Sequence, residues 1–250
     1  MNPLWIALST LTLIPVSVAD PTAADLKRSV VFYPFVGALL GFFLFLLHLL
    51  PIGHDLQALV VLIVWVLLTG AFHLDGLGDC LDGWFGGRDP KERQRIMKTS
   101  DLGTYGMVGI ALTLIAKYVL LDHLFTQGHM DLLTNESHTG FWLIAIPAAA
   151  RWAACSACSI GKAPAGNKGL GSQVLGLSGT GFLMATFLTL IFIFPLKWAV
   201  LGVFFIAALI SAGVTELSQF RIGGLTGDGM GAMIELSEVG LLFFACLSHV

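Results

Sequence analysis

Residues 30–50 read VVFYPFVGALLGFFLFLLHLL, an apolar run without Asp, Glu, Lys or Arg. A helix needs ~20 apolar residues to cross a ~30 Å hydrocarbon layer, so this run is long enough to span a membrane. Within it, Gly37 and Gly41 have the spacing of a small-residue motif for helix packing. Comparable apolar runs occur at residues 1–18, 56–74, 102–121, 141–160, 181–196, 198–214 and 230–247. The repetition predicts a polytopic membrane protein.

The composition of the whole chain supports this prediction. Of 250 residues, 56% are hydrophobic and 12% are charged, about half the ~25% charged fraction of a soluble domain. This excludes a disordered chain and an ordinary soluble enzyme. The 13 Lys and Arg against 16 Asp and Glu give a net charge of −3, which excludes a nucleic-acid binder because phosphates need a basic surface.

The kind of membrane fold follows from the length of the runs. Outer-membrane barrels show short alternating segments instead of long apolar ones, so we expect an all-α fold. The first run contains Pro3 and Pro15, which make it poorly suited to a full span. We therefore expect about seven transmembrane helices plus a short or interfacial N-terminal helix, in a single integral-membrane domain that covers residues 1–250.

The loops between the runs differ sharply in charge. Loops 51–55 and 122–139 contain no Lys or Arg, whereas most of the basic residues lie in loops 20–29, 83–101, 161–178 and 215–229. The positive-inside rule places these basic loops in the cytoplasm, as in a bacterial inner-membrane protein. The two loops richest in Gly and Asp, 75–106 and 221–231, then share one face of the membrane.

Three acidic residues follow the third apolar run. Residues 73–83 read HLDGLGDCLDG, and Asp75, Asp79 and Asp82 have the i, i+4, i+7 spacing of one helix face. Three carboxylates beside hydrocarbon repel one another unless a cation lies among them. Because carboxylate oxygens suit a hard cation, we expect Mg²⁺ here. We expect His73 to be an interfacial polar residue and not a ligand.

The next stretch carries basic residues and glycines. Residues 86–109 read GGRDPKERQRIMKTSDLGTYGMVG, and Arg88 and Arg93 are candidates for binding phosphates, although membrane topology alone accounts for most of these charges. Asp101 and Thr104 lie in the glycine-punctuated segment that begins the next span. Backbone N–H groups at such a helix start can receive an anion.

A second glycine-rich motif lies at residues 221–231, RIGGLTGDGMG. Its glycines and threonine are typical of a backbone cradle for a phosphate, and Asp228 has the residue type of an N-cap for the last helix. The proposed cradle consists of Gly223, Gly224, Thr226 and Gly227.

Four ionisable residues lie inside the apolar runs. Glu235 and Glu238 are one turn apart in the last run, and intramembrane acids usually face the bundle interior. Lys117 and Arg151 are the only basic residues deep within the spans. Two roles are open for either of them, a structural ion pair with a buried acid or a part in catalysis.

Three stretches of this sequence resemble the cobalamin synthase family of adenosylcobinamide-GDP ribazoletransferases. These stretches are residues 73–83, residues 97–106, and GGLTGDGMGAMIELSE at residues 223–238. The resemblance implies a membrane enzyme that joins adenosylcobinamide-GDP to α-ribazole, or to its 5′-phosphate, releases GMP and requires Mg²⁺. One departure is Leu13, at a position where the family often has Arg, which puts a phosphate contact there in doubt.

The resemblance also assigns the motifs. The family's acidic motif falls on Asp75, Asp79, Asp82 and Gly83, and its second motif falls on Gly224, Thr226, Gly227 and Asp228. We expect the first three aspartates to bind the metal, and either Asp82 or Asp228 to accept the proton of the ribazole hydroxyl. The expected substrate-binding residues are Arg88, Arg93, Asp101, Thr104, Gly223, Gly224, Thr226 and Gly227.

Two other classes of membrane protein share some of these features. A CDP-alcohol phosphatidyltransferase also uses clustered aspartates and Mg²⁺, but there Asp-Gly opens the motif, whereas Asp82-Gly83 closes it here. An ion-coupled transporter needs polar residues at mid-membrane depth and often internal repeats, and we find no convincing repeat. Besides its substrates and the lipid bilayer, a second copy of the chain in a homo-oligomer is the remaining candidate partner.

Overall fold

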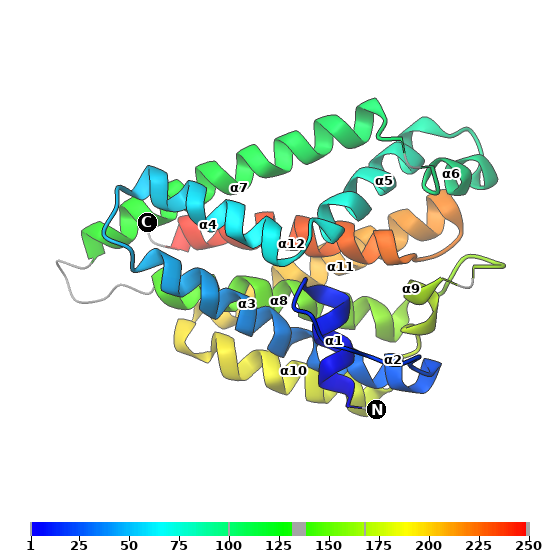
Figure 1. The fold of residues 1–250 in the computed structure, drawn as a ribbon, viewed down its shortest axis with the longest axis horizontal. Helices are drawn as coiled ribbons and strands as arrows, with labels where there is room; N and C mark the ends of the chain where they lie inside the picture. The colour runs from blue at the N-terminus through cyan, green and yellow to red at the C-terminus, as the bar shows by residue number, and fades with distance from the viewer. Residues whose placement is uncertain (1, 100, 132–138, 168, 249–250) are drawn as a thin grey trace.

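The computed structural model describes residues 2–99, 101–131, 139–167 and 169–248, and in these ranges every regular element is a helix (Figure 1). The all-α prediction is therefore confirmed. Short 3-10 turns lie at Val30–Phe32 and Phe194–Leu196. The helices are α1 (Pro3–Leu11), α2 (Ala23–Ser29), α3 (Tyr33–His48), α4 (His54–Leu68), α5 (Phe72–Gly86), α6 (Pro90–Ile96), α7 (Thr104–Asp131), α8 (Thr139–Ile160), α9 (Leu170–Gln173), α10 (Gly179–Ile193), α11 (Ala199–Ile222) and α12 (Gly227–Ser248).

Six helices in the described ranges are long and apolar enough to cross a membrane, and a seventh span results if α4 and α5 count as one broken helix. This confirms the expected multi-pass architecture. Helix α1 has nine residues, about 13 Å at 1.5 Å per residue, which is too short to span. As expected for a short N-terminal helix, it lies across the direction of the other helices (Figure 1).

The third apolar run differs from our expectation, because it does not form one continuous helix over residues 56–74. Helix α4 ends at Leu68 and α5 begins at Phe72, and their axes are bent by 82°. Gly70 and Ala71 between them have φ of 62° and 57°, the left-handed region that a residue with a Cβ enters at a cost of ~1–2 kcal/mol. The N–H of Leu13, after α1, donates to the carbonyl of Leu68 at 2.9 Å. The break places the acidic motif at the start of a new helix that begins near the middle of the bundle (Figure 1).

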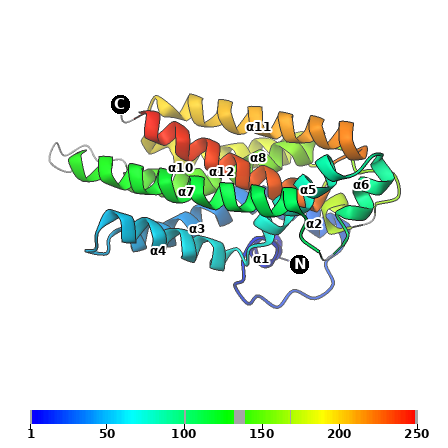
Figure 2. The same cartoon turned by 90° about the horizontal axis from the view of Figure 1, so that it is seen from above.

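Glycines bring the central helices into backbone contact. A Cβ on Gly37 of α3 would lie 2.3 Å from the carbonyl oxygen of Pro147 in α8, so the predicted Gly-x-x-x-Gly packing motif is confirmed. A Cβ on Gly76 of α5 would lie 2.9 Å from the carbonyl oxygen of Asp228. Helix α12 also packs against α7, α8 and α11, and it lies between α7 and α11 in Figure 2.

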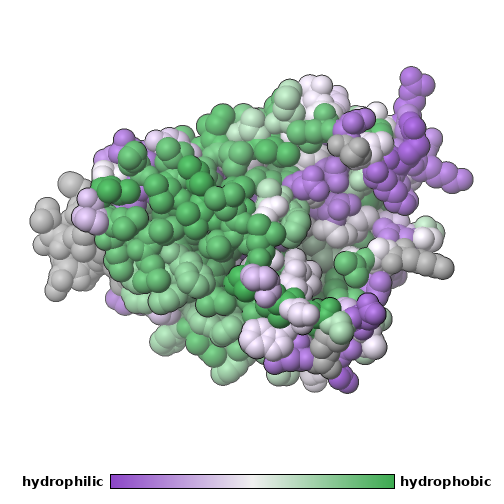
Figure 3. All heavy atoms as spheres, viewed as in Figure 1, coloured by the Kyte–Doolittle hydropathy of each residue, from purple (hydrophilic) through white to green (hydrophobic). Residues whose placement is uncertain are grey.

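The polar elements gather at one end of the bundle. Helices α2, α6 and α9 and the turn between α11 and α12 lie at this end, where hydrophilic side chains are concentrated, while the rest of the visible face is largely hydrophobic (Figure 3). The side chain of Arg93 donates to the carbonyl of Arg221 at 3.1 Å, and that of Gln94 to the carbonyl of Ile222 at 2.8 Å. The two Gly- and Asp-rich loops therefore meet, as the loop charges predicted.

Candidate active site

A cavity of about 310 Å³ lies at the polar end, between α1, α5, α9 and the start of α12. Two carboxylates line it, Asp75 from the first turn of α5 and Asp228 from the first turn of α12. Much of the remaining wall is apolar, with Leu11, Leu26 and Val174 among its residues. This volume lies at the lower end of the range for small-molecule sites, ~300–1,000 Å³.

Asp75 and Asp228 lie close together because their helices touch through glycines. Besides the contact of Gly76 with Asp228, a Cβ on Gly231 would lie 3.2 Å from the Cα of His73. Larger residues at Gly76 or Gly231 would force α5 and α12 apart. The glycines that the sequence places among the acids thus bring two carboxylates from distant segments to one cavity.

Asp79 lies one turn beyond Asp75 and is half-buried. It is repelled by the charges of Asp75, Asp228 and Asp82, in that order of strength. In the described ranges none of Asp75, Asp79 and Asp228 has an ion-pair partner. This uncompensated negative charge favours a cation or a proton in the site.

Asp82 faces a different part of the protein. Its side chain is 7% exposed, and its two oxygens accept hydrogen bonds from the N–H groups of Gly103 at 2.7 Å and Gly106 at 2.9 Å. These N–H groups lie at the start of α7, where helical donors lack a partner within the helix. The anion that we expected at this helix start is thus a carboxylate of the chain itself. The role of Asp82 as a metal ligand stays a prediction.

Replacing Asp82 by Ala is expected to lower the free energy of unfolding by ~1–3 kcal/mol, because one buried and one partly buried N–H group lose a charged acceptor. Asp82→Asn keeps one acceptor oxygen and should lose less. Thermal unfolding of the purified chain in detergent measures both effects. Asp79→Ala is the control, and it should not destabilise the chain because it removes repulsion. Equal unfolding temperatures for Asp82→Ala and the unchanged chain would show that Asp82 does not stabilise the start of α7.

The glycine-rich turn shapes the start of α12. Gly223 has φ of 79° and ends α11, and the N–H of Leu225 donates to the carbonyl of Lys162 at 2.8 Å. A Cβ on Gly224 would lie 2.5 Å from that same oxygen. Because the N–H groups of Gly223 and Gly224 also donate to backbone carbonyls of α11, these two predicted cradle residues hold the turn in place. Their contact with a substrate stays a prediction.

Thr226, and not Asp228, caps the last helix, so our expectation for Asp228 as N-cap is wrong. The hydroxyl of Thr226 accepts from the N–H of Gly229 at 3.2 Å, and α12 begins at Gly227. A threonine one residue before the helix supplies the acceptor, so the carboxylate of Asp228 is not needed as the cap and lines the cavity. Gly227 also lines it, so the positive end of the α12 dipole lies at the cavity wall.

The other predicted substrate-binding residues lie outside the cavity. Arg93 donates through Nε to the carbonyl of Gly87 at 3.0 Å, in addition to its bond with Arg221, so it ties α6 to α11. Arg88 is exposed beside α6, and Asp101 and Thr104 are exposed near the start of α7. A role for any of these four in binding substrate stays a prediction.

Helix α6 is held by a cap of its own. The side chain of Asp89 accepts from the N–H groups of Lys91 and Glu92 at 2.9 and 3.0 Å. These hydrogen bonds, that of Glu92 above all, hold the pKa of Asp89 below its usual range. The cap fixes the basic helix at the polar end of the bundle.

The sequence reasoning missed part of the cavity wall. Tyr33 at the start of α3 and Thr10 in α1 both line the cavity. Helix α9 also contributes, since a Cβ on Gly171 would lie 2.3 Å from the backbone nitrogen of Gly227. The one signal for α9 was the pair of glycines at positions 169 and 171 in a basic loop, which by itself indicates only a turn.

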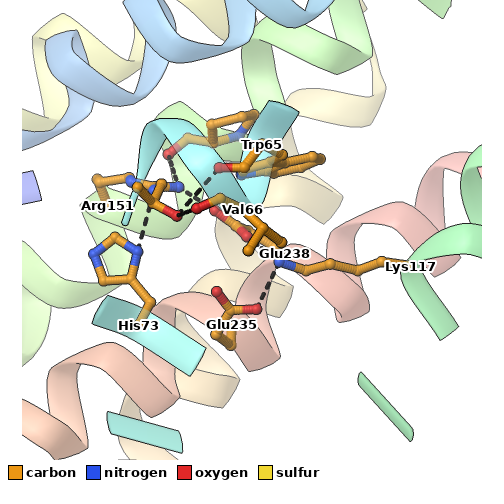
Figure 4. A network of polar contacts seen from close by, with 9 residues as sticks. Trp65, Val66, His73, Lys117, Arg151, Glu235 and Glu238 are labelled. Carbon is orange, nitrogen blue, oxygen red and sulfur yellow. Dashed lines mark hydrogen bonds and ion pairs between the residues drawn. The ribbon is translucent and has the colours of Figure 1, made fainter. Parts of the chain in front are cut away.

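A buried ionic network lies next to the cavity (Figure 4). Lys117 of α7 donates to Glu235 at 2.6 Å and to Glu238 at 2.5 Å, and Arg151 of α8 bonds the other oxygen of Glu238. Of the two roles open for these basic residues, the ion pair with a buried acid is confirmed. Two positive and two negative charges balance, as buried charges require.

His73 connects this network to the acidic motif. Its Nδ1 lies 3.4 Å from the guanidinium of Arg151, and its side chain also lines the cavity (Figure 4). Our expectation of an interfacial residue is wrong, because His73 is 5% exposed. The break before α5 turns this residue into the bundle. The network therefore joins α7, α8 and α12 to the helix that carries Asp75.

A hard cation fits the donors at the cavity, which are carboxylate oxygens. No group of three or more His, Cys, Asp and Glu side chains within the described part of the chain has the spacing of a metal site. Mg²⁺ usually binds one or two carboxylates together with waters and substrate phosphates, without an all-protein cage. Asp75 and Asp228 match that pattern better than three ligands on one helix.

Comparisons with known proteins identify the family of the chain. A family model described as cobalamin-5-phosphate synthase matches residues 3–246. A relative from Pseudomonas syringae pv. syringae is 34% identical over 99% of this chain and 100% of its own length, and one from Acinetobacter baumannii is 34% identical over 100% and 98%. One from Pseudomonas entomophila is 36% identical over 97% of both chains. All three are named adenosylcobinamide-GDP ribazoletransferase, and no solved structure matches.

Proposed function

Because the chain belongs to the cobalamin-5-phosphate synthase family, we infer that it acts as an adenosylcobinamide-GDP ribazoletransferase in a membrane. It joins adenosylcobinamide-GDP to α-ribazole, or to its 5′-phosphate, and releases GMP. In addition to family membership, one structural observation supports this inference: Asp75 and Asp228 line the same cavity at the polar end of the bundle.

The reaction transfers a phosphoryl group from one oxygen to another. A ribose hydroxyl oxygen of α-ribazole, one that is also free in the 5′-phosphate, bonds to the phosphorus nearer the corrinoid, the bond from that phosphorus to the bridging oxygen breaks, and GMP leaves with the bridging oxygen. The hydroxyl proton passes to a base. Such chemistry asks a protein mainly for positioning and for neutralisation of charge.

We propose that Asp228 accepts this proton. It lines the cavity and is half-buried, and its side chain is not needed as the cap of α12. Of the two candidates from the sequence it is now favoured, because both oxygens of Asp82 accept backbone hydrogen bonds. Asp75 lines the same cavity from α5, where it would orient the phosphates through a shared cation.

Asp75 and Asp228 would hold Mg²⁺ together with the pyrophosphate, and Asp79 would add negative charge from the next turn. The ion would neutralise the phosphate oxygens and stabilise the leaving GMP. The start of α12 adds its own positive dipole at Gly227. These residues bind and orient the phosphates even though no arginine lines the cavity in the described ranges.

The position of the site suits a large amphipathic substrate. The cavity would take the phosphate and sugar groups, and the corrin ring would lie at the border between the polar end and the lipid-facing surface. We propose that this end faces the cytoplasm of a bacterial inner membrane, because α6 lies there (Figure 1) with Lys91 and Arg95, and Lys98 follows it.

Purified chain is expected to release GMP from adenosylcobinamide-GDP only when α-ribazole and Mg²⁺ are both present. Chromatography of the nucleotides measures GMP, and EDTA should abolish its release until Mg²⁺ is added in excess. Full release of GMP in EDTA would contradict the requirement for Mg²⁺ but not the transferase activity. Absence of GMP release in every condition, together with cation flux in liposomes, would instead favour a transporter. Release of CMP from a CDP-alcohol lipid would favour a phosphatidyltransferase.

A further inference from the structure

A second cavity, of about 490 Å³, lies beside α2 at the same polar end. Helix α2 separates the two cavities, because Leu26 lines the candidate active site whereas Lys27 and Arg28 line the second one. The segment before α10 does the same, with Val174 in one wall and Gly176 in the other. The reaction proposed above makes no use of this second cavity.

The polar part of this cavity is positively charged. Lys27 and Arg28 are exposed, neither forms an ion pair within the described ranges, and no acidic residue is among the lining residues there. The Nζ of Lys27 lies beside Gly176, 3.5 Å from the point where a Cβ on that glycine would stand, which is an ordinary van der Waals distance. Two unpaired cations in one hollow suit an anion with several oxygens, such as a phosphate.

The opposite part of the cavity is apolar and continues into the lipid-facing surface. Met184 of α10 lines the cavity and is 58% exposed. The next residues outward on α10, among them Phe187 and Ile191, are also exposed, as expected for a face that contacts acyl chains. Phe32 and Val31 complete the apolar wall. A soluble phosphate compound would gain nothing from this wall, whereas a lipid would fill it.

We propose that this cavity binds an anionic phospholipid, with its phosphate between Lys27 and Arg28 and an acyl chain along α10. The lipid bridges α2 to α10, and Leu26 of α2 is also part of the wall of the candidate active site. The phosphate matches the basic part of the cavity, which lies at the polar end. The acyl chain matches the apolar wall, which extends toward the bilayer.

The test uses the full-length chain in detergent, stripped of lipid and then mixed with phosphatidylglycerol or phosphatidylcholine. Native mass spectrometry counts bound lipid, and thermal unfolding measures stabilisation. Phosphatidylglycerol should bind and raise the unfolding temperature more than phosphatidylcholine does. The double change Lys27→Gln and Arg28→Gln should weaken its binding about 30-fold, the factor for two cations at a membrane surface.

Two further variants distinguish the cavity from general attraction by positive charge. Lys91→Gln with Arg95→Gln removes the same charge from α6 at the same end, outside the cavity, and should leave binding unchanged. Ala24→Trp alters no charge but fills the cavity, and it should displace the lipid. Equal losses in the α6 variant, or full binding by Ala24→Trp, would overturn the proposal. Equal stabilisation by glycerol phosphate alone would overturn the lipid assignment in favour of a soluble phosphate.

Discussion

Replacing Asp228 by Asn should lower the rate of GMP release by ~10²–10⁴-fold, the range for loss of a general base. The change keeps the size of the side chain but removes the proton acceptor and one of the two carboxylates that line the cavity. The helix start should persist because Thr226 supplies the cap. Turnover at saturating substrates and at a series of Mg²⁺ concentrations measures the effect.

The other carboxylates and a control complete this experiment. Asp75→Asn should also abolish measurable turnover and raise the Mg²⁺ requirement, and Asp79→Asn should abolish GMP release while membrane insertion stays intact. Glu216→Gln removes an exposed acid near the same end of α11 and should leave the rate unchanged. Full turnover by Asp228→Asn at ordinary Mg²⁺ would remove that residue from the mechanism.

Replacing Glu238 by Ala should destabilise the chain by ~3–5 kcal/mol, the cost of leaving buried charges without their partner. Glu238 is fully buried and bonds both Lys117 and Arg151. Arg151 has no other acidic partner in the described ranges, whereas Lys117 keeps Glu235. Denaturation of the purified chain in detergent, followed by tryptophan fluorescence or circular dichroism, measures the loss.

Two comparisons separate this network effect from a general loss of side-chain volume. Glu235→Ala should cost less, because Lys117 then keeps Glu238. Adding Arg151→Met to Glu238→Ala should restore part of the stability, since replacing both partners removes the unpaired charge. If Glu238→Ala unfolded like the unchanged chain, the network would not stabilise the bundle.

The fold class could be predicted because hydrophobicity is a property of each segment by itself. Residues 30–50 are apolar enough to span a membrane whatever surrounds them, and the same holds for most of the other runs. The meeting of loops 75–106 and 221–231 could be predicted because loop charge orients every span in turn. Even the pairing of Lys117 and Arg151 with buried acids was one of two predicted roles, because an unpaired charge in hydrocarbon is costly.

The arrangement of the acidic motif could not be predicted in this way. Helical spacing puts Asp75, Asp79 and Asp82 on one face, but it does not say which neighbour each carboxylate meets. Asp82 binds the start of α7, and Asp75 meets Asp228, which is 153 residues away by number (228 − 75). The buried position of His73 likewise depends on the break at Gly70 and Ala71.

The sequence by itself determined that this is an all-helical membrane protein of its family, with acids and glycines at one end, since these are properties of short segments. Only the tertiary structure decided which carboxylates share a cavity and which one closes a helix end. Those outcomes depend on contacts between helices that are distant in the chain, such as Gly76 against Asp228. Such contacts leave no periodic signal in either segment alone, because each forms only when both helices are in place.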